Sequence, residues 1–295
     1  MKVNQRSLFL SGTVLLLAVF CPACADLLKL EPQDPADMTV QELIVKMNQA
    51  TDPKGVYRNC KSYVMKQEFS TIRSGTRDNY SLEVKFKAPN RIRITTFRGS
   101  RATIADIYNN GQAWKVDCIM GKGTKVTGMG LSLVEIFSQM ANPAMDATKI
   151  FKKVTIDMST DTGVKMYRLI CDPCKDGIAP YVFYIDGSTF LTVRLETIMY
   201  ASDGEEYLYI SLPTAYEWFG EFRIPTTSTV KLMDATNISK VTEFAINVDI
   251  PDSEFLPPVP FTHQAEILQE VRKASAMISA KPAEKSASAS KKEKK

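Results

Sequence analysis

Four of the six cysteines, Cys60, Cys118, Cys171 and Cys174, lie after the predicted leader at residues 1–25, and they could support redox chemistry or a disulfide framework. Cys171 and Cys174 have the two-residue spacing of redox-active pairs, in which a helix N-terminus lowers the pKa of one thiol. Residues 175–180 instead resemble a loop between strands, which favours a structural disulfide. An even number of cysteines in an exported chain indicates disulfides, and four cysteines allow three pairings. Among these we favour Cys171–Cys174 with Cys60–Cys118.

Other residue types that support catalysis do not form a recognisable pattern. His263 is the single histidine and lies beyond the predicted strands, which argues against a Ser-His-Asp triad or a multi-histidine metal site. Lys122 follows a glycine, but Val116 and Gly123 break the phosphate-loop pattern. Carboxylates near the end of the body are interpreted as solvated turn residues: Asp234, Asp249, Asp252 and Glu254. The sequence therefore predicts no enzyme, no metal site and no cofactor.

Charge is unevenly distributed along the chain. The whole chain has 37 basic and 33 acidic residues and a formal net charge of +4. Two basic residues lie in the first 25 positions, and residues 281–295 hold six lysines and two glutamates. The body, residues 26–280, keeps 29 basic and 31 acidic residues. Because the body is nearly neutral, we expect no nucleic-acid partner.

The first 25 residues have the three-part layout of a secretory signal peptide. Lys2 and Arg6 give a basic start, an apolar run follows, and Ala23-Cys24-Ala25 has the small-x-small pattern that signal peptidase cleaves. We therefore expect an exported, periplasmic protein that begins at Asp26. An alternative is lipidation of Cys24, which would anchor the chain to a membrane.

Period-two alternation of apolar and polar residues dominates the chain from about residue 60. Residues 81–87 and 91–94 show this pattern, with Leu82, Val84 and Phe86 in the first segment and Ile92 and Ile94 in the second. It recurs in three later segments: Leu191, Val193, Leu195 and Met199; Leu208, Ile210 and Leu212; Phe244, Ile246, Val248 and Ile250. Such alternation is typical of strands with one buried face and one wet face.

Turn residues separate several of these strands. The pairs Asn110-Gly111, Asp186-Gly187 and Asp203-Gly204 accept the positive φ angles of tight hairpins. Consecutive strands are therefore expected to pair antiparallel, in a meander.

One helix is predicted before the strands, and a second helix interrupts the strand pattern. Thr39 and Glu42 predict a capping box at the start of the first helix, and Asp-Pro-Lys-Gly at 52–55 predicts its end. A glycine-rich loop is expected at 121–130. Residues 131–141 are apolar on almost every side, so this second helix must be buried, and we expect it on the concave side of the sheet.

The residues after 258 differ in character from the predicted β domain, which spans 26–258. Prolines end the strand region, and a final helix is predicted within 259–280. Residues 281–295 are rich in Lys, Ala and Ser and are predicted to form a disordered basic tail.

Several segments resemble one known family. Phe86–Arg93, with Pro-Asn between two strand-like stretches, resembles the early signature of the LolA/LolB-type lipoprotein carriers. Residues 107–114 are similar to the family's next hairpin, which has a glycine turn and a Trp-bearing strand. The apolar helix falls where the family has helices that plug its barrel. Residues 222–258 resemble the closing strands of longer outer membrane lipoprotein-sorting proteins.

The resemblance covers about residues 38–258 and implies a mainly β protein. The implied fold is a half-open antiparallel β-barrel with an internal helical lid and a cavity for acyl chains. We therefore predict an envelope carrier that binds the acyl chains of a lipoprotein, or another lipid, in outer membrane lipoprotein sorting. An alternative is a non-catalytic interaction or sensor module of the same fold, with a membrane protein of the envelope as its partner.

The predicted binding residues follow from the alternating faces and the apolar helix. The predicted cavity wall comprises Leu82, Val84, Phe86, Ile92, Ile94, Leu191, Val193, Leu195, Leu208 and Ile210. The predicted lid residues are Leu133, Phe137 and Met140.

Overall fold

A computed structural model describes residues 28, 33–159, 163–200 and 205–258 of the chain. The first half of this part contains, in chain order, β1 (Asp34–Pro35), α1 (Val40–Thr51), β2 (Ser62–Arg73), β3 (Thr76–Lys87), β4 (Arg91–Arg98), β5 (Arg101–Asn109), β6 (Gln112–Asp117) and β7 (Lys122–Val126). The second half contains α2 (Gly128–Met140), α3 (Ala147–Ile150), β8 (Phe151–Ser159), β9 (Met166–Pro173), β10 (Tyr181–Asp186), β11 (Thr192–Tyr200), β12 (Glu206–Phe219), β13 (Phe222–Leu232), β14 (Ala235–Ile246) and the 3₁₀ turn η1 (Asp252–Phe255).

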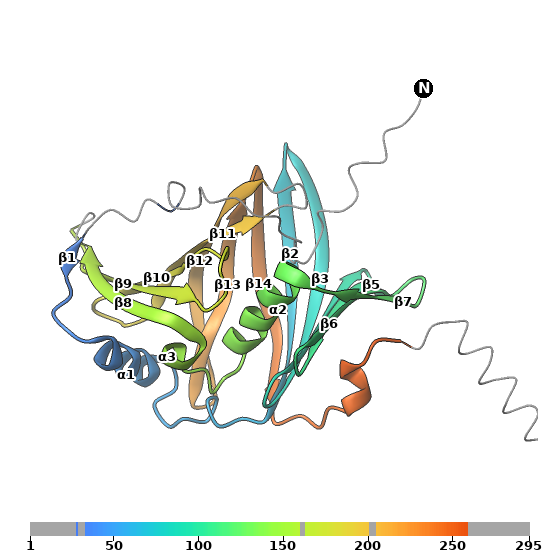
Figure 1. Cartoon of the computed structure of the whole chain (residues 1–295), viewed down its shortest axis with the longest axis horizontal. Helices are drawn as coiled ribbons and strands as arrows, with labels where there is room; N and C mark the ends of the chain where they lie inside the picture. The colour runs from blue at the N-terminus through green and yellow to red at the C-terminus, as the bar shows by residue number, and fades with distance from the viewer. Residues whose placement is uncertain (1–27, 29–32, 160–162, 201–204, 259–295) are drawn as a thin grey trace, which may run out of the picture.

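All described strands belong to one antiparallel sheet. Its order is β1-β8-β9-β10-β11-β12-β13-β14-β2-β3-β4-β5-β6-β7, so each half of the chain forms a meander and the two halves meet where β14 pairs with β2. The sheet has β1 and β7 as its edges and does not close. Figure 1 shows it curving behind α2, with β8 and β9 on one side of this helix and β5 and β6 on the other. The prediction of a mainly β, half-open antiparallel fold is confirmed.

The first helix begins and ends where its sequence predicts. The Thr39 side chain accepts a hydrogen bond from the Glu42 backbone N–H, and the Thr39 backbone N–H donates to the Glu42 carboxylate at 2.7 Å. This reciprocal capping satisfies two of the amides that a helix start leaves without intrahelical partners. Asp52 ends α1, directly before the proline and glycine of the predicted stop.

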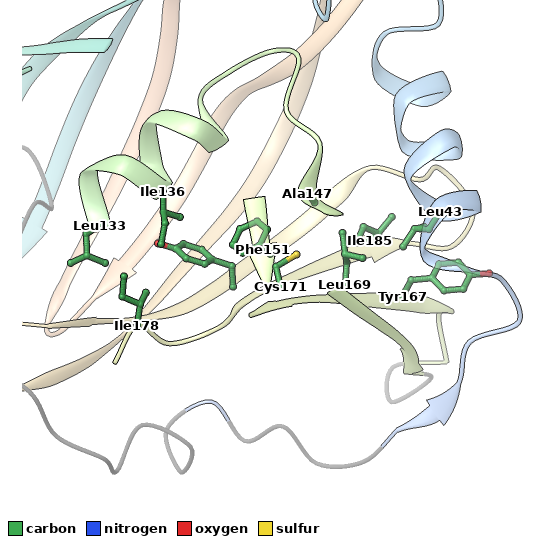
Figure 2. Packing of buried hydrophobic residues seen from close by; sticks show 11 residues of the cluster. Leu43, Leu133, Ile136, Ala147, Phe151, Tyr167, Leu169, Cys171, Ile178 and Ile185 are labelled. Carbon is green, nitrogen blue, oxygen red and sulfur yellow. The ribbon is translucent and has the colours of Figure 1, made fainter. Parts of the chain in front are cut away.

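The second helix, α2, joins two separate clusters of buried side chains. Leu133 and Ile136 pack with Phe151 and other residues of β8–β10, whereas Val134 packs with residues of β2–β6. We call the face of the sheet that α2 contacts the inner face, and the other the outer face. Figure 2 shows Leu133 and Ile136 pointing from α2 toward Phe151 and Ile178. The predicted burial of an internal helix against the sheet is confirmed.

The outer face of β3–β6 is covered by the segment 247–256. Ile250 and Phe255 are buried there against side chains of β5 and β6. The Lys87 ammonium donates to Ile250 O at 2.7 Å and to Asp252 Oδ1 at 2.6 Å, and Arg91 lies 2.8 Å from the same carboxylate. These two cations lower the pKa of Asp252. Apolar burial and ion pairs together hold this segment on the sheet (Figure 1).

The predicted turns have different outcomes. Asn110 (φ 46°) and Gly111 (φ 87°) form the tight hairpin between β5 and β6, as predicted. The turn after Asp186 is longer than predicted, because the residue with positive φ is Phe190 (φ 55°) and Asp186 Oδ1 accepts from the amides of Ser188 and Thr189. Gly187 instead permits a close approach, since an added Cβ would lie 2.7 Å from Lys165 O.

The remaining expectations are corrected or lie outside the described residues. The loop predicted at 121–130 contains the short edge strand β7 and the first turn of α2. The Asp203-Gly204 turn, the leader 1–25 and the segments 259–280 and 281–295 lie outside the described residues. Within the described part, no helix has the length and apolarity needed to cross a membrane.

The predicted disulfides are wrong, because all four cysteines of the body are free. Cys60 packs with the inner-face cluster and Cys118 with the outer-face cluster, so the sheet separates them. Cys171 is buried in β9, and Cys174 is exposed just after its end. Three steps of extended chain separate their Cα atoms by about 10 Å, which exceeds the roughly 7 Å limit for a disulfide.

Candidate functional site

The first half of the predicted cavity wall lies together on the inner face. Val84 and Phe86 of β3 pair with Ile94 and Ile92 of β4, and Leu82 follows on the same face of β3. Four of these side chains are buried, and Leu82 is partly buried against them. Their alternation with charged residues places the polar partners on the outer face, as the period-two pattern predicted.

The second half of the predicted wall is only partly formed. Leu195 lies on the inner face and packs against the α2 cluster. Leu208 pairs with Ile198, and Ile210 pairs with Glu196, so both face the outer side and the expectation of an inner position is wrong. Leu208 packs instead against the outer-face cluster that contains Leu28.

Two further predicted wall residues sit near an irregularity. Leu191 precedes β11, and Val193 lies at a bulge where the pairing with β10 shifts register between Tyr184 and Ile185. The polar side of β11 was predicted to face solvent, and this prediction is wrong. Glu196 is buried and accepts a 2.8 Å hydrogen bond from the Tyr184 hydroxyl.

Aromatic side chains that were not predicted as site residues pack around Phe86 of the predicted wall on the inner face. The rings of Tyr63, Phe86 and Phe244 stack with centroids 5.2 and 5.5 Å apart. Tyr57 from the loop before β2 contacts Phe222 and Phe244 at 5.3 and 5.9 Å. Tyr63 and Met65 lie two positions apart in β2, and this spacing could have predicted that both face the inner side. The position of Tyr57 could not be predicted from the sequence, because Tyr57 lies in a loop, where no periodic pattern indicates the direction of a side chain.

The predicted lid residues lie on the sheet-facing side of α2. At 3.6 residues per turn, Phe137 lies one turn after Leu133 and Val134 and one turn before Met140 and Ala141. Leu133 and Met140 belong to the cluster of β8–β10, whereas Val134 and Ala141 belong to the cluster of β2–β6. Phe137 therefore points between the two clusters. Its side chain is nevertheless 43% exposed, so the expectation that α2 is buried on all sides is wrong at this residue.

Hydrogen bonds hold the C-terminal end of α2 to the turn between β3 and β4. The Ser138 hydroxyl donates to Asn90 Oδ1 at 2.9 Å, and the Asn142 side-chain amide donates to Pro89 O at 3.1 Å. The Tyr63 hydroxyl donates to Ala141 O at 3.1 Å. The Pro-Asn pair that suggested a family resemblance is thus the attachment point of the helix.

Burial favours the protonated, uncharged forms of several tyrosines and of Cys171. It raises the pKa of the Tyr181 phenol to about 12 and raises those of Tyr63 and Tyr209. Burial also raises the pKa of the Cys171 thiol to about 12, the opposite of what thiol-disulfide exchange requires. Within the described ranges, no group of three His, Cys, Asp or Glu side chains could hold a metal ion. Apolar and aromatic side chains therefore dominate the inner face beside α2.

Comparison with known proteins supports the fold assignment. No protein-family model matches the chain, and no curated protein matches it in sequence. A crystal structure of a LolA superfamily protein from Nitrosomonas europaea superposes with a TM-score of 0.52 at 14% identity, covering 74% of this chain and 98% of that one. A DUF1329 family protein from Desulfovibrio piger superposes with a TM-score of 0.53 at 13% identity, covering 73% and 95%.

A third solved structure has the same arrangement. It is a domain from Vibrio parahaemolyticus assigned as an outer membrane lipoprotein-sorting protein, with a TM-score of 0.51 at 9% identity, covering 72% of this chain and 94% of that one. Identities this low establish the fold and leave function to the residues of the site. This chain is therefore a divergent protein of the LolA-like fold.

Proposed function

We propose that this protein is an exported carrier that holds the acyl chains of a lipid or a lipoprotein between α2 and the inner face of the sheet. The chain has the fold of a domain assigned to lipoprotein sorting, and its inner face beside α2 is lined by apolar and aromatic side chains. The leader predicted at residues 1–25 would deliver it to the envelope.

The exposed ring of Phe137 is the observation that carries this proposal. A phenylalanine that points toward a sheet from a packed helix is normally enclosed, because leaving a large apolar side chain in water forfeits about 1.5–3 kcal/mol. Here the four residues one turn away on either side are buried or partly buried, while Phe137 is 43% exposed. An acyl chain lying between the two clusters would cover this ring.

Binding of this kind requires no covalent step. Each CH₂ group transferred from water contributes about 0.8 kcal/mol, so one or two acyl chains supply enough free energy for a stable complex. Release requires α2 to move away from the sheet. That movement breaks the hydrogen bonds at Asn90, Pro89 and Tyr63, each worth on the order of 1 kcal/mol, and also exposes the buried side chains of α2 unless the sheet or the ligand covers them.

Titration with a fluorescent long-chain fatty acid tests this proposal. The Phe137→Asp variant places a charge between the two clusters and is expected to lower affinity at least tenfold while the protein stays folded, because the native side chain is already partly exposed. Val45→Asp is the matched control, since Val45 is 43% exposed on α1. Unchanged binding by folded Phe137→Asp would show that α2 does not cover the ligand. Absence of binding by the native protein would favour the alternative role as a non-catalytic interaction module.

A further inference from the structure

The hairpin between β6 and β7 displays two apolar side chains at its turn. Ile119 is 51% exposed and Met120 is 66% exposed, the largest value among the exposed large hydrophobic residues of the described part. Turns are usually built from Gly, Pro, Asn, Asp or Ser. Figure 1 shows this hairpin extending away from α2 at the side of the molecule. We call Ile119 and Met120 the β6–β7 tip.

Hydrogen bonds give the β6–β7 tip a defined backbone shape. The backbone N–H groups of Ile119 and Met120 both donate to Asp117 Oδ1, at 2.9 Å each. The Cys118 N–H donates to Thr103 O of β5 at 3.0 Å. The tip is therefore held in place by the end of the sheet, and both of its apolar residues are exposed.

Exposed basic residues lie on the two strands next to the β6–β7 tip, β7 and β5. Lys122 and Lys125 are exposed on the edge strand β7, and Arg101 is exposed at the start of β5, two residues before the Thr103 carbonyl that holds the tip. The Asp117 carboxylate is engaged by the two amides of the turn. The surface beside the tip thus combines exposed apolar groups with positive charge.

We propose that the β6–β7 tip inserts into the interface of an anionic lipid bilayer, with Lys122 and Lys125 contacting the headgroup phosphates. Apolar side chains flanked by lysines are the combination that binds such interfaces, because transfer of the apolar groups and attraction to anionic lipid act together. A protein partner would be expected to offer acidic side chains and is an outcome that the test distinguishes. This inference is independent of whether α2 covers a ligand.

Co-sedimentation of the full chain with vesicles tests the proposal. The native protein is expected to sediment with vesicles that contain phosphatidylglycerol, and much less with pure phosphatidylcholine. The double variant Ile119→Asp/Met120→Asp is expected to lose most of this binding. Reversal of charge in Lys122→Glu/Lys125→Glu is expected to weaken it by about fivefold per lysine at low salt. Added salt should also weaken the binding of the native protein to these vesicles, because it screens the attraction between lysines and anionic lipid.

Matched controls separate the tip from general effects of charge. Val45→Asp removes an exposed apolar residue on α1, and Lys231→Glu/Lys240→Glu reverses two exposed lysines on β13 and β14. Both controls should bind vesicles more strongly than the tip variants do. The proposal is overturned if Ile119→Asp/Met120→Asp binds like the native chain, since the tail at 281–295 or another surface would then bind the lipid. It is also overturned if the native chain binds no anionic vesicle, a result that leaves a protein partner for the tip.

Discussion

The Ser138 hydroxyl of α2 donates a 2.9 Å hydrogen bond to Oδ1 of Asn90 in the turn between β3 and β4. Ser138 is completely buried, so this bond ties the inner helix to the sheet away from water. The turn is also held from the outer face, where Asp252 contacts Lys87 and Arg91 on either side of it. The position of the helix therefore depends on a turn that is fixed on both faces of the sheet.

Removal of the Ser138 hydroxyl should loosen α2. In Ser138→Ala the partly buried side-chain oxygen of Asn90 loses this donor, at a cost of about 1 kcal/mol. Amide hydrogen exchange should accelerate several-fold in α2 and much less in α1. Ser100→Ala, in an exposed turn, is the control and should leave both helices unchanged. Equal acceleration in α1 and α2 would indicate a global loss of stability and contradict a local anchor.

Two residues one turn apart on α2 should respond differently to truncation. Leu133 is 6% exposed within the cluster of β8–β10, so Leu133→Ala should destabilise the protein by about 2–4 kcal/mol. Phe137→Ala should cost less than about 1.5 kcal/mol, because its ring is already partly in water. Chemical denaturation measures both. A Phe137→Ala loss as large as that of Leu133→Ala would show that the ring is part of the closed core.

Stability should fall on the alkaline side of pH 9. Burial raises the pKa of Cys171 to about 12 from an ordinary 9.0, and those of Tyr181, Tyr184 and Tyr216 to about 12 from 10.0. Groups with a raised folded pKa hold their protons more tightly in the folded state, so their contribution is complete below the unfolded pKa. It is lost as the pH rises toward 12. The melting temperature should therefore fall as the pH is raised from 9 to 12. A melting temperature that stays constant over this range would contradict the prediction.

Thiol labelling should distinguish the four cysteines. Cys174 is exposed and should react quickly with a disulfide reagent, whereas Cys171 is fully buried and should react only after unfolding. Mass spectrometry of labelled peptides, with Cys171→Ser as a control, identifies the sites. A Cys171–Cys174 disulfide in the native protein would contradict the separation of these residues along β9.

The fold was largely predictable because its signals are local. Period-two alternation in β3 and β4 predicted correctly that the apolar residues of these strands share one face. The capping residues Thr39 and Glu42 predicted the start of α1. The two-sided burial of α2 followed from its composition, since residues on neighbouring faces of one helix must each find a cluster.

The rest depends on contacts between distant segments. Leu208 and Ile210 alternate with polar residues as the inner-face residues do, but alternation alone does not say which face of the sheet is inner. Ile198 and Tyr200 pack with Leu28 on the outer face, so both sides of β11 are buried. The cysteine pairing failed for the same reason, because the sheet that separates Cys60 from Cys118 is formed only by the complete strand order.

The most direct test of the carrier proposal is native mass spectrometry of the mature protein, purified without detergent extraction from cells that export it. The organic extract of the same sample should be analysed in parallel. We expect a complex with one or two acyl chains that dissociates on activation, and a matching lipid or acylated peptide in the extract. A folded protein with the mass of the bare chain and no extractable lipid would contradict the proposal that α2 and the inner face enclose acyl chains.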